Sequence, residues 1–122
     1  KLIDLALEYS TAYFDMFIPI KGVCKFHHLD SVRKQEGKAP PELEEWYGLQ
    51  MPEIFDETWE IFQDLSRRRA YTESGPCSIT YTEIDSYYRL NGMEISPLAL
   101  DMVIKFDETF LSEYANKRKQ QQ

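Results

Sequence analysis

The sequence predicts an all-α protein, a small bundle of about five helices that ends in a helical hairpin. Apolar residues recur every three or four positions over most of the 122 residues, and prolines and glycines separate the periodic segments. No segment of strand length alternates apolar with polar residues. With 43% hydrophobic residues, the chain has enough apolar side chains to bury the core of one domain.

The first predicted helix spans residues 2–17. Its apolar side chains follow a spacing of three to four residues, which is typical of an amphipathic helix with one buried face. Pro19 and Gly22 follow this segment and end the helix. An amphipathic helix at this position packs on its own domain or docks on a neighbouring subunit, and the sequence leaves both arrangements open.

Two shorter segments precede the central helix. Residues 27–36 are typical of a short helix, with Leu29 and Val32 inward and Gly37 as its C-terminal cap. Pro40 and Pro41 come next and predict an extended stretch, because a proline disfavours helical backbone in the residue before it.

The strongest helical pattern covers residues 52–70, with Pro52 in its first turn. Acidic residues fill that turn and arginines gather near the end. Each charge stabilises the helix macrodipole by about 0.3–1 kcal/mol, so a solvated helix face explains much of the acidity. The predicted apolar stripe consists of Phe55, Trp59, Phe62 and Leu65, widened by Ile54 and Ile61.

Two further helices complete the predicted bundle. Thr80 and Glu83 have the spacing of a capping box, which begins a helix that ends before Gly92. Ser96 caps the last helix and Pro97 takes its first position. The two apolar stripes are formed by Ile84, Tyr87, Tyr88 and Leu90, and by Leu100, Val103, Phe106, Phe110 and Tyr114.

These elements divide the chain into three predicted parts. Residues 1–26 form an N-terminal helix and connector, which can mark the junction with an upstream domain. Residues 27–116 form the helical domain, with a turn at residues 74–76. Residues 117–122 are polar and predict a disordered tail.

Charge and composition exclude several classes of function. The net charge of −7 argues against a binder of nucleic acid or anionic membrane, because phosphate contacts need a positive field. Residues 42–64 hold eight acids and no base, so the imbalance belongs to this one segment. No apolar run approaches the roughly 20 residues that span a bilayer. Two cysteines are too few for a secreted disulfide scaffold and indicate a reducing compartment.

The sequence contains no complete catalytic or metal-binding pattern. Cys24, His27, His28 and Cys77 lack the second close ligand pair of a structural zinc site, although zinc binding through them stays a distant alternative. Neither cysteine lies in a nucleophile motif, and no glycine-rich phosphate loop is present. We therefore expect no enzyme activity, no metal and no cofactor.

The aromatic content favours a protein-binding module. Aromatic residues make up 14% of the chain, more than so small a core accommodates. Tryptophan, tyrosine and arginine are enriched at interface hot spots, and an acidic helix beside them supplies a charge-selective rim. The predicted partner-binding residues are Trp46, Tyr47, Glu53, Glu57, Glu60, Arg67, Arg68 and Tyr71.

A series of short motifs between His28 and Pro97 carries a family resemblance. The motifs are Pro41-Glu42-Leu43, an aromatic helix ending in Leu65-Ser66-Arg67, the turn Gly75-Pro76, the segment Ile79-Thr80-Tyr81-Thr82-Glu83-Ile84, and then Leu90, Gly92 and Pro97. Each motif is common, and their order is the specific signal. This order resembles the tail assembly chaperones of long-tailed bacteriophages and prophages, in particular their frameshift-extension domain.

The resemblance implies a non-catalytic role in the host bacterial cytoplasm. Such chaperones coat the tape-measure protein and recruit tail-tube subunits during tail assembly, so the implied partners are these two proteins. The sequence leaves self-association open. The alternative is an acidic DNA mimic that inhibits a host nucleic-acid enzyme, based on the eight acids in residues 42–64. Mimicry requires carboxylates spaced along one surface like phosphates.

Overall fold

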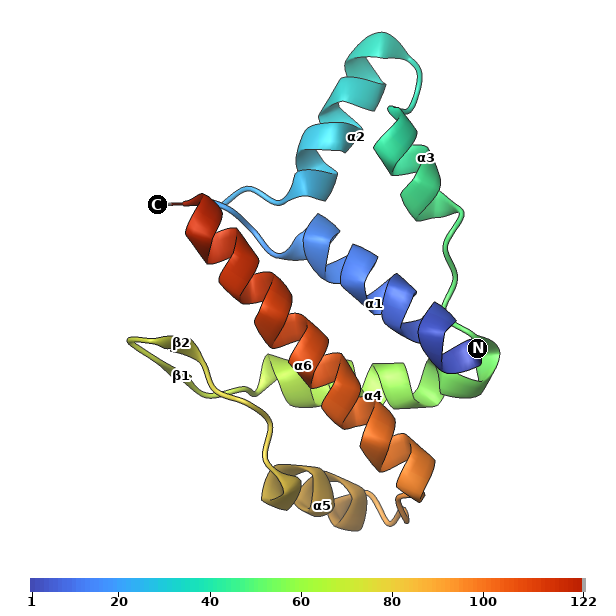
Figure 1. The fold of residues 1–122 in the computed structure, drawn as a ribbon, viewed down its shortest axis with the longest axis vertical. Coiled ribbons are helices and arrows are strands. Elements are labelled where there is room, and N and C mark those ends of the chain that lie inside the picture. The colour runs from blue at the N-terminus through green and yellow to red at the C-terminus, as the bar shows by residue number, and fades with distance from the viewer. Residues whose placement is uncertain (122) are drawn as a thin grey trace.

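Within residues 1–121, which the computed structural model describes, the chain forms six α-helices, a 3-10 helix and a small β-hairpin (Figure 1). The predicted all-α class and small bundle are confirmed. In chain order the elements are α1 (Leu2–Phe17), α2 (Lys25–Glu36), α3 (Pro41–Tyr47), η1 (Glu53–Phe55), α4 (Asp56–Arg67), β1 (Tyr71–Thr72), β2 (Gly75–Pro76), α5 (Tyr81–Leu90) and α6 (Pro97–Gln120).

The main core lies where α6 packs against both α1 and α4 (Figure 1). Ala6 of α1, Phe62 of α4 and Phe106 of α6 are fully buried there. Trp59 packs edge-on against Phe106, with ring centroids 5.0 Å apart. Helix α5 adds Ile84 to the same core and packs against α4. The first helix therefore packs on its own domain, which answers the question that the sequence left open.

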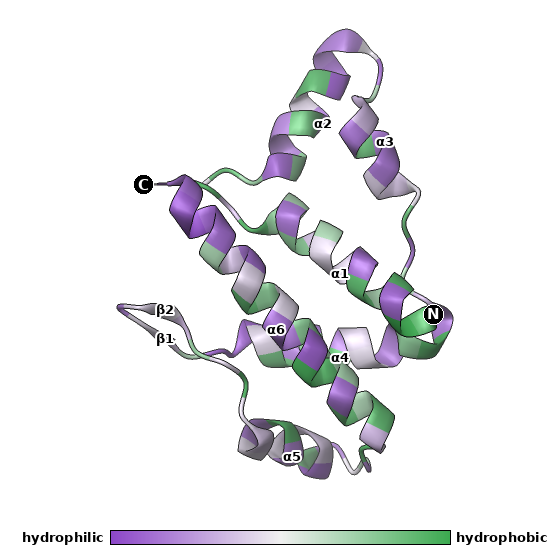
Figure 2. Cartoon of the chain, in the orientation of Figure 1, coloured by the Kyte–Doolittle hydropathy of each residue, from purple (hydrophilic) through white to green (hydrophobic). Residues whose placement is uncertain are grey.

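Helices α2 and α3 form a separate arm, residues 25–47, which projects from one end of the bundle (Figure 1). This arm has a small core of its own, in which Leu29 and Leu43 pack on Met16 of α1. Figure 2 shows that α2 is mostly hydrophilic, and Leu29 is its one buried residue. Trp46 attaches the arm to α1, with its ring centroid 5.2 Å from that of Tyr9.

Ion pairs connect the arm to the bundle. Lys25 Nζ, at the start of α2, donates a hydrogen bond of 2.9 Å to Asp15 Oδ2 and lies 2.6 Å from Glu42 Oε2 of α3. Lys117 Nζ of α6 donates to the other oxygen of Asp15 at 2.7 Å. One carboxylate at the end of α1 thus joins the first and last helices to the arm.

The predicted helix caps are confirmed. Thr80 and Glu83 form a reciprocal capping box, in which the Glu83 N–H donates to Thr80 Oγ1 at 3.1 Å and the Thr80 N–H donates to Glu83 Oε1 at 2.9 Å. Ser96 Oγ accepts from the Ala99 N–H at 3.1 Å and begins α6. Gly37 ends α2 in the left-handed conformation, with φ of 73°. These caps depend on neighbours in sequence, which explains why the sequence predicts them.

Three segments differ from the prediction. Only Pro40 is extended, because Pro41 begins helix α3; a first turn tolerates proline, whose missing N–H would have no intrahelical acceptor. The predicted helix over residues 52–70 is too long, since η1 precedes α4 and α4 ends at Arg67. The paired strands β1 and β2 occur where the sequence predicts only a turn.

The predicted disordered tail is wrong for residues 117–120, because α6 continues through Gln120, and Gln122 lies outside the described residues. The Lys117 side chain is only 5% exposed and is held by its ion pair. Two side chains of the predicted stripes, Ile54 and Leu90, are exposed rather than inward. Both lie at the end of a helical segment, where the neighbouring elements no longer cover them.

Candidate partner-binding surface

The outer face of α4 carries a row of charged side chains. Glu57, Glu60 and Asp64 recur at three and four residues, so they share the helix side opposite its buried stripe. Glu53 of η1 precedes them and is also exposed. No base of the described chain forms an ion pair with Glu53, Glu57 or Glu60. Their carboxylates are free to attract a partner.

Asp64 is different, because it already has two partners. It forms an ion pair with Arg67, one turn later, and accepts a hydrogen bond of 2.8 Å from the Tyr87 hydroxyl of α5. The Tyr87 hydrogen bond and then the Arg67 pair hold the pKa of Asp64 below its ordinary value. The same hydrogen bond raises the pKa of Tyr87. Asp64 therefore fixes α5 on α4.

An open groove of about 500 Å³ lies between α4 and α5, and we call it the α4–α5 groove. Leu65 and Tyr87 contribute its apolar surface, and Leu90, a residue that is 87% exposed, also lines it. Polar and charged residues complete the walls. The lining residues are Asp64, Leu65, Arg68, Thr82, Glu83, Ser86, Tyr87, Leu90 and Asn91.

A second, smaller groove of about 240 Å³ lies between α1, α4, β1 and α6, and we call it the aromatic groove. Phe14 and five other aromatic residues line this groove, and its lining contains no charged side chain. A shallow hollow on α4, lined in part by Glu60 and Arg67, shares Gln63 with this groove and Asp64 with the α4–α5 groove. The outer face of α4 thus separates two adjoining grooves. The remaining lining residues of the aromatic groove are Tyr13, Phe17, Ile18, Pro19, Gln63, Ser66, Tyr71, Phe110 and Tyr114.

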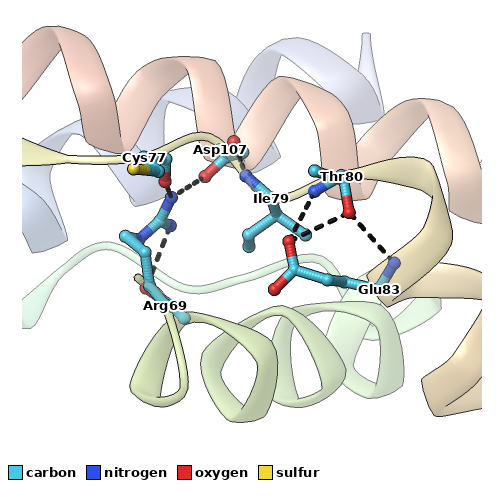
Figure 3. A network of polar contacts seen from close by, with 7 residues as sticks. Arg69, Cys77, Ile79, Thr80, Glu83 and Asp107 are labelled. Carbon is cyan, nitrogen blue, oxygen red and sulfur yellow. Dashed lines mark hydrogen bonds and ion pairs between the residues drawn. The ribbon is translucent and has the colours of Figure 1, made fainter. Parts of the chain in front are cut away.

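A buried polar network holds the segment between α4 and α5 in place (Figure 3). Arg69 Nη1 lies 2.6 Å from Asp107 Oδ1 of α6, a close ion pair whose angles fall outside those of an aligned hydrogen bond. Arg69 Nη1 also donates to the Cys77 carbonyl at 2.8 Å, and Asp107 Oδ2 accepts from the Ile79 N–H at 3.0 Å. The guanidinium carbon sits 4.3 Å from the Phe110 ring centroid.

The sequence does not predict this network. It places Arg69 with the other arginines at the end of a helix, where a solvated charge is expected. A signal was nevertheless present, since Asp107 is four residues after Val103 and three before Phe110, on the buried side of α6. A carboxylate on an apolar stripe needs a buried partner. The network positions the hairpin that carries Tyr71, and hence one wall of the aromatic groove.

The structure brings four of the eight predicted partner-binding residues to these hollows. Glu60 and Arg67 line the hollow on α4, Arg68 lines the α4–α5 groove, and Tyr71 lines the aromatic groove. The other four are placed differently. Trp46 is half-buried against α1. Tyr47, Glu53 and Glu57 are exposed and line neither groove nor the hollow on α4. A role of the eight residues in binding stays a prediction.

The candidate metal ligands do not come together. Cys24 and His28 line one hollow near Asp15, whereas the Cys77 carbonyl is bound to Arg69. In residues 1–121, no group of three or more histidine, cysteine, aspartate or glutamate side chains could hold a metal ion. In the same part of the chain, no helix has the length and apolar character needed to cross a bilayer.

Comparison with protein-family models identifies the family of the chain. A family model described as phage tail assembly chaperone matches residues 32–112. The chain belongs to this family. The resemblance predicted from the order of motifs is confirmed, and the match runs from α2 into α6 and contains all of α4 and α5. Comparisons of the chain with curated proteins and with solved structures give no significant match.

Proposed function

We propose that this tail assembly chaperone is a non-catalytic protein that binds the tape-measure protein, the tail-tube protein or both while the virion tail is assembled in the host cytoplasm. The observation that carries the proposal is the family match over residues 32–112. It covers both helices of the α4–α5 groove and the α4 wall of the aromatic groove.

The surface around α4 supports this role physically. A chaperone of apolar helices needs a hydrophobic surface for the client and enough net charge to keep the complex soluble. The two grooves supply apolar and aromatic surface, and the net charge is −7. We infer that the unpaired carboxylates of Glu53, Glu57 and Glu60 guide the approach and orientation of the client, as charged rims do at other interfaces.

The proposed binding surface comprises the residues predicted from the sequence, centred on the face of α4 between the grooves. Tyr71 and Tyr47 are exposed and supply aromatic contacts, and Trp46 precedes Tyr47 on α3 and is half-buried against α1. Arg67 and Arg68 end the acidic row of α4 with positive charge. A client with both apolar and charged residues is complementary to such a surface.

Co-expression tests the proposal. The tape-measure and tail-tube proteins encoded beside this chain would each be produced with and without it, and complexes would be isolated by size-exclusion chromatography with light scattering. We expect this chain to form a stoichiometric complex with at least one of them and to raise its soluble yield. If protein with a native circular-dichroism spectrum and a cooperative melt forms a complex with neither, the proposal is wrong.

The alternative of a DNA mimic has less support. Of the eight acids in residues 42–64, Glu42 is paired with Lys25 and Asp64 with Arg67, so two charges are unavailable for imitating phosphates. Replacing Glu53, Asp56, Glu57 and Glu60 by glutamine would abolish competition with DNA if mimicry were the function. Competition that survives these replacements would exclude it.

A further inference from the structure

The charged side chains of the α4–α5 groove differ in whether they already have partners. Asp64 holds Arg67 and the Tyr87 hydroxyl, and Glu83 accepts from Thr80 in the capping box. Arg68 is exposed and forms neither an ion pair nor a side-chain hydrogen bond with the described chain, and it acts on Asp64 only through longer-range attraction. Arg68 is therefore the charged group of this groove that has no hydrogen-bond or ion-pair partner in the described chain.

The apolar surface of the groove is also exposed to water. Leu90, in the last turn of α5, is the most exposed of the large hydrophobic side chains, at 87%. It adjoins the apolar surface of Leu65 and Tyr87 in the same groove. An apolar side chain seated here would remove Leu90 from water and extend the buried surface of the bundle.

We propose that the α4–α5 groove binds an amphipathic segment of the client in which a large apolar residue covers Leu90 and an aspartate or glutamate pairs with Arg68. This inference rests on the proposed function, because the client is the tail protein that the chaperone binds. Asp64 and Glu83 Oε1 already accept hydrogen bonds within the chain, whereas the Arg68 guanidinium donates none, so the unused donor of this groove matches an acidic residue of the client. A guanidinium binds a carboxylate through two parallel hydrogen bonds, which selects an acidic residue and fixes its direction.

Affinity measurements with matched variants test the two contacts. Arg68→Ala is compared with Arg89→Ala, an exposed arginine of α5 that is paired with Asp85 and lies outside the groove lining. Leu90→Asp is compared with Leu98→Asp, an exposed leucine of α6 that is also outside it. We expect Arg68→Ala and Leu90→Asp each to weaken the complex with the co-purified tail protein by about tenfold or more. The two controls should change it by less than about threefold.

A photo-crosslinker at position 90 identifies the occupant. With p-benzoylphenylalanine in place of Leu90, we expect a crosslink to a client segment with an acidic residue within one helical turn of the crosslinked apolar residue. Reversing the charges, with Arg68→Glu in the chaperone and lysine for that acid in the client, should restore binding. A crosslink to a basic segment, or to a second copy of this chain, would overturn the inference.

The outcomes separate this inference from the proposed function. If the wild-type complex forms and all four single variants bind the client as tightly as the wild type does, the groove is not the binding site, while the chaperone role stands. If wild-type protein binds neither tail protein, both are overturned. Matching circular-dichroism spectra and melting temperatures of the variants would confirm that loss of binding does not reflect misfolding.

Discussion

Arg69 and Asp107 form a buried ion pair, with Nη1 and Oδ1 2.6 Å apart and the two side chains only 1% and 7% exposed. Each partner also bonds the backbone of the segment that joins β2 to α5, through the Cys77 carbonyl and the Ile79 N–H. Two charges in the interior are stable only when each compensates the other. The pair therefore determines where this segment crosses α6.

Removing one partner of this pair should be strongly destabilising. Asp107→Ala leaves a buried guanidinium without its counter-charge, and we expect it to lower the free energy of unfolding by about 3–5 kcal/mol. The double variant Arg69→Met with Asp107→Leu has no buried charge and should lose less than the single variant. Urea denaturation measures both. A double variant that is less stable than Asp107→Ala would show that the backbone hydrogen bonds matter more than the charges.

The capping box of α5 should contribute measurably to stability. Thr80→Ala removes the acceptor of the Glu83 N–H, and we expect a loss of about 1 kcal/mol in the free energy of unfolding. Thr82→Ala is the matched control, because Thr82 is exposed in the first turn of the same helix and is not its cap. Equal effects of the two substitutions on the urea midpoint would contradict this assignment.

The link between the arm and the bundle should weaken in acid. Partial burial raises the pKa of Asp15, but hydrogen bonds from Lys117 and Lys25 outweigh it and hold that pKa below its ordinary value of 3.8. A depressed folded-state pKa gives stability that is complete above 3.8 and is lost as pH falls through the folded value. Glu42, the other acid beside Lys25, can retain part of the link.

Asp15→Asn tests this link. At pH 7 we expect it to lower the free energy of unfolding by about 1–3 kcal/mol, because the buried Lys117 loses its charged partner. The difference from wild type should shrink as pH falls below 3.8. Asp4→Asn, an exposed and unpaired acid of α1, should change stability by less than about 0.5 kcal/mol. A difference that is constant with pH would exclude the ionised carboxylate as its cause.

The aromatic groove should contribute to client binding through Tyr71. Tyr71→Ser removes an exposed ring that packs on Tyr114, and we expect at least a tenfold weaker complex with the tail protein, about the effect of a moderate hot spot. Tyr81→Ser is the control, since Tyr81 is exposed but lines neither groove. Isothermal titration calorimetry with the purified client distinguishes them, and equal affinities would assign no role to this groove.

Local features of the sequence predicted most of the helices correctly. The bounds of the first helix, the capping box at Thr80 and the left-handed glycine after α2 follow from residues within a few positions of each other. Helix α3 was missed because Pro41 is compatible with both an extended segment and a helical first turn. Contacts with α1, which is distant in sequence, favour the helical first turn, because Leu43 and Trp46 of α3 pack on α1.

The candidate surface could be predicted only in part. The acidic row of α4 follows from helical spacing, so Glu60 and Arg67 are predicted, but the aromatic groove beside it is formed by elements that converge from both ends of the chain. Tyr71 was predicted for its residue type, whereas its place opposite Tyr114 depends on the Arg69 network. Leu90 was assigned to the core because periodicity shows which side of a helix is apolar and not how far its neighbours extend.

The sequence by itself determined the helical class, the family and the helix caps, because these depend on short-range periodicity, motif order and local hydrogen bonds. The tertiary structure alone decided which charges are buried. Lys117 is 102 residues from Asp15, and the sequence presents it as part of a polar tail. Burial of a charge depends on a counter-charge supplied by another element, and only the packing of α1, α4 and α6 brings such residues together.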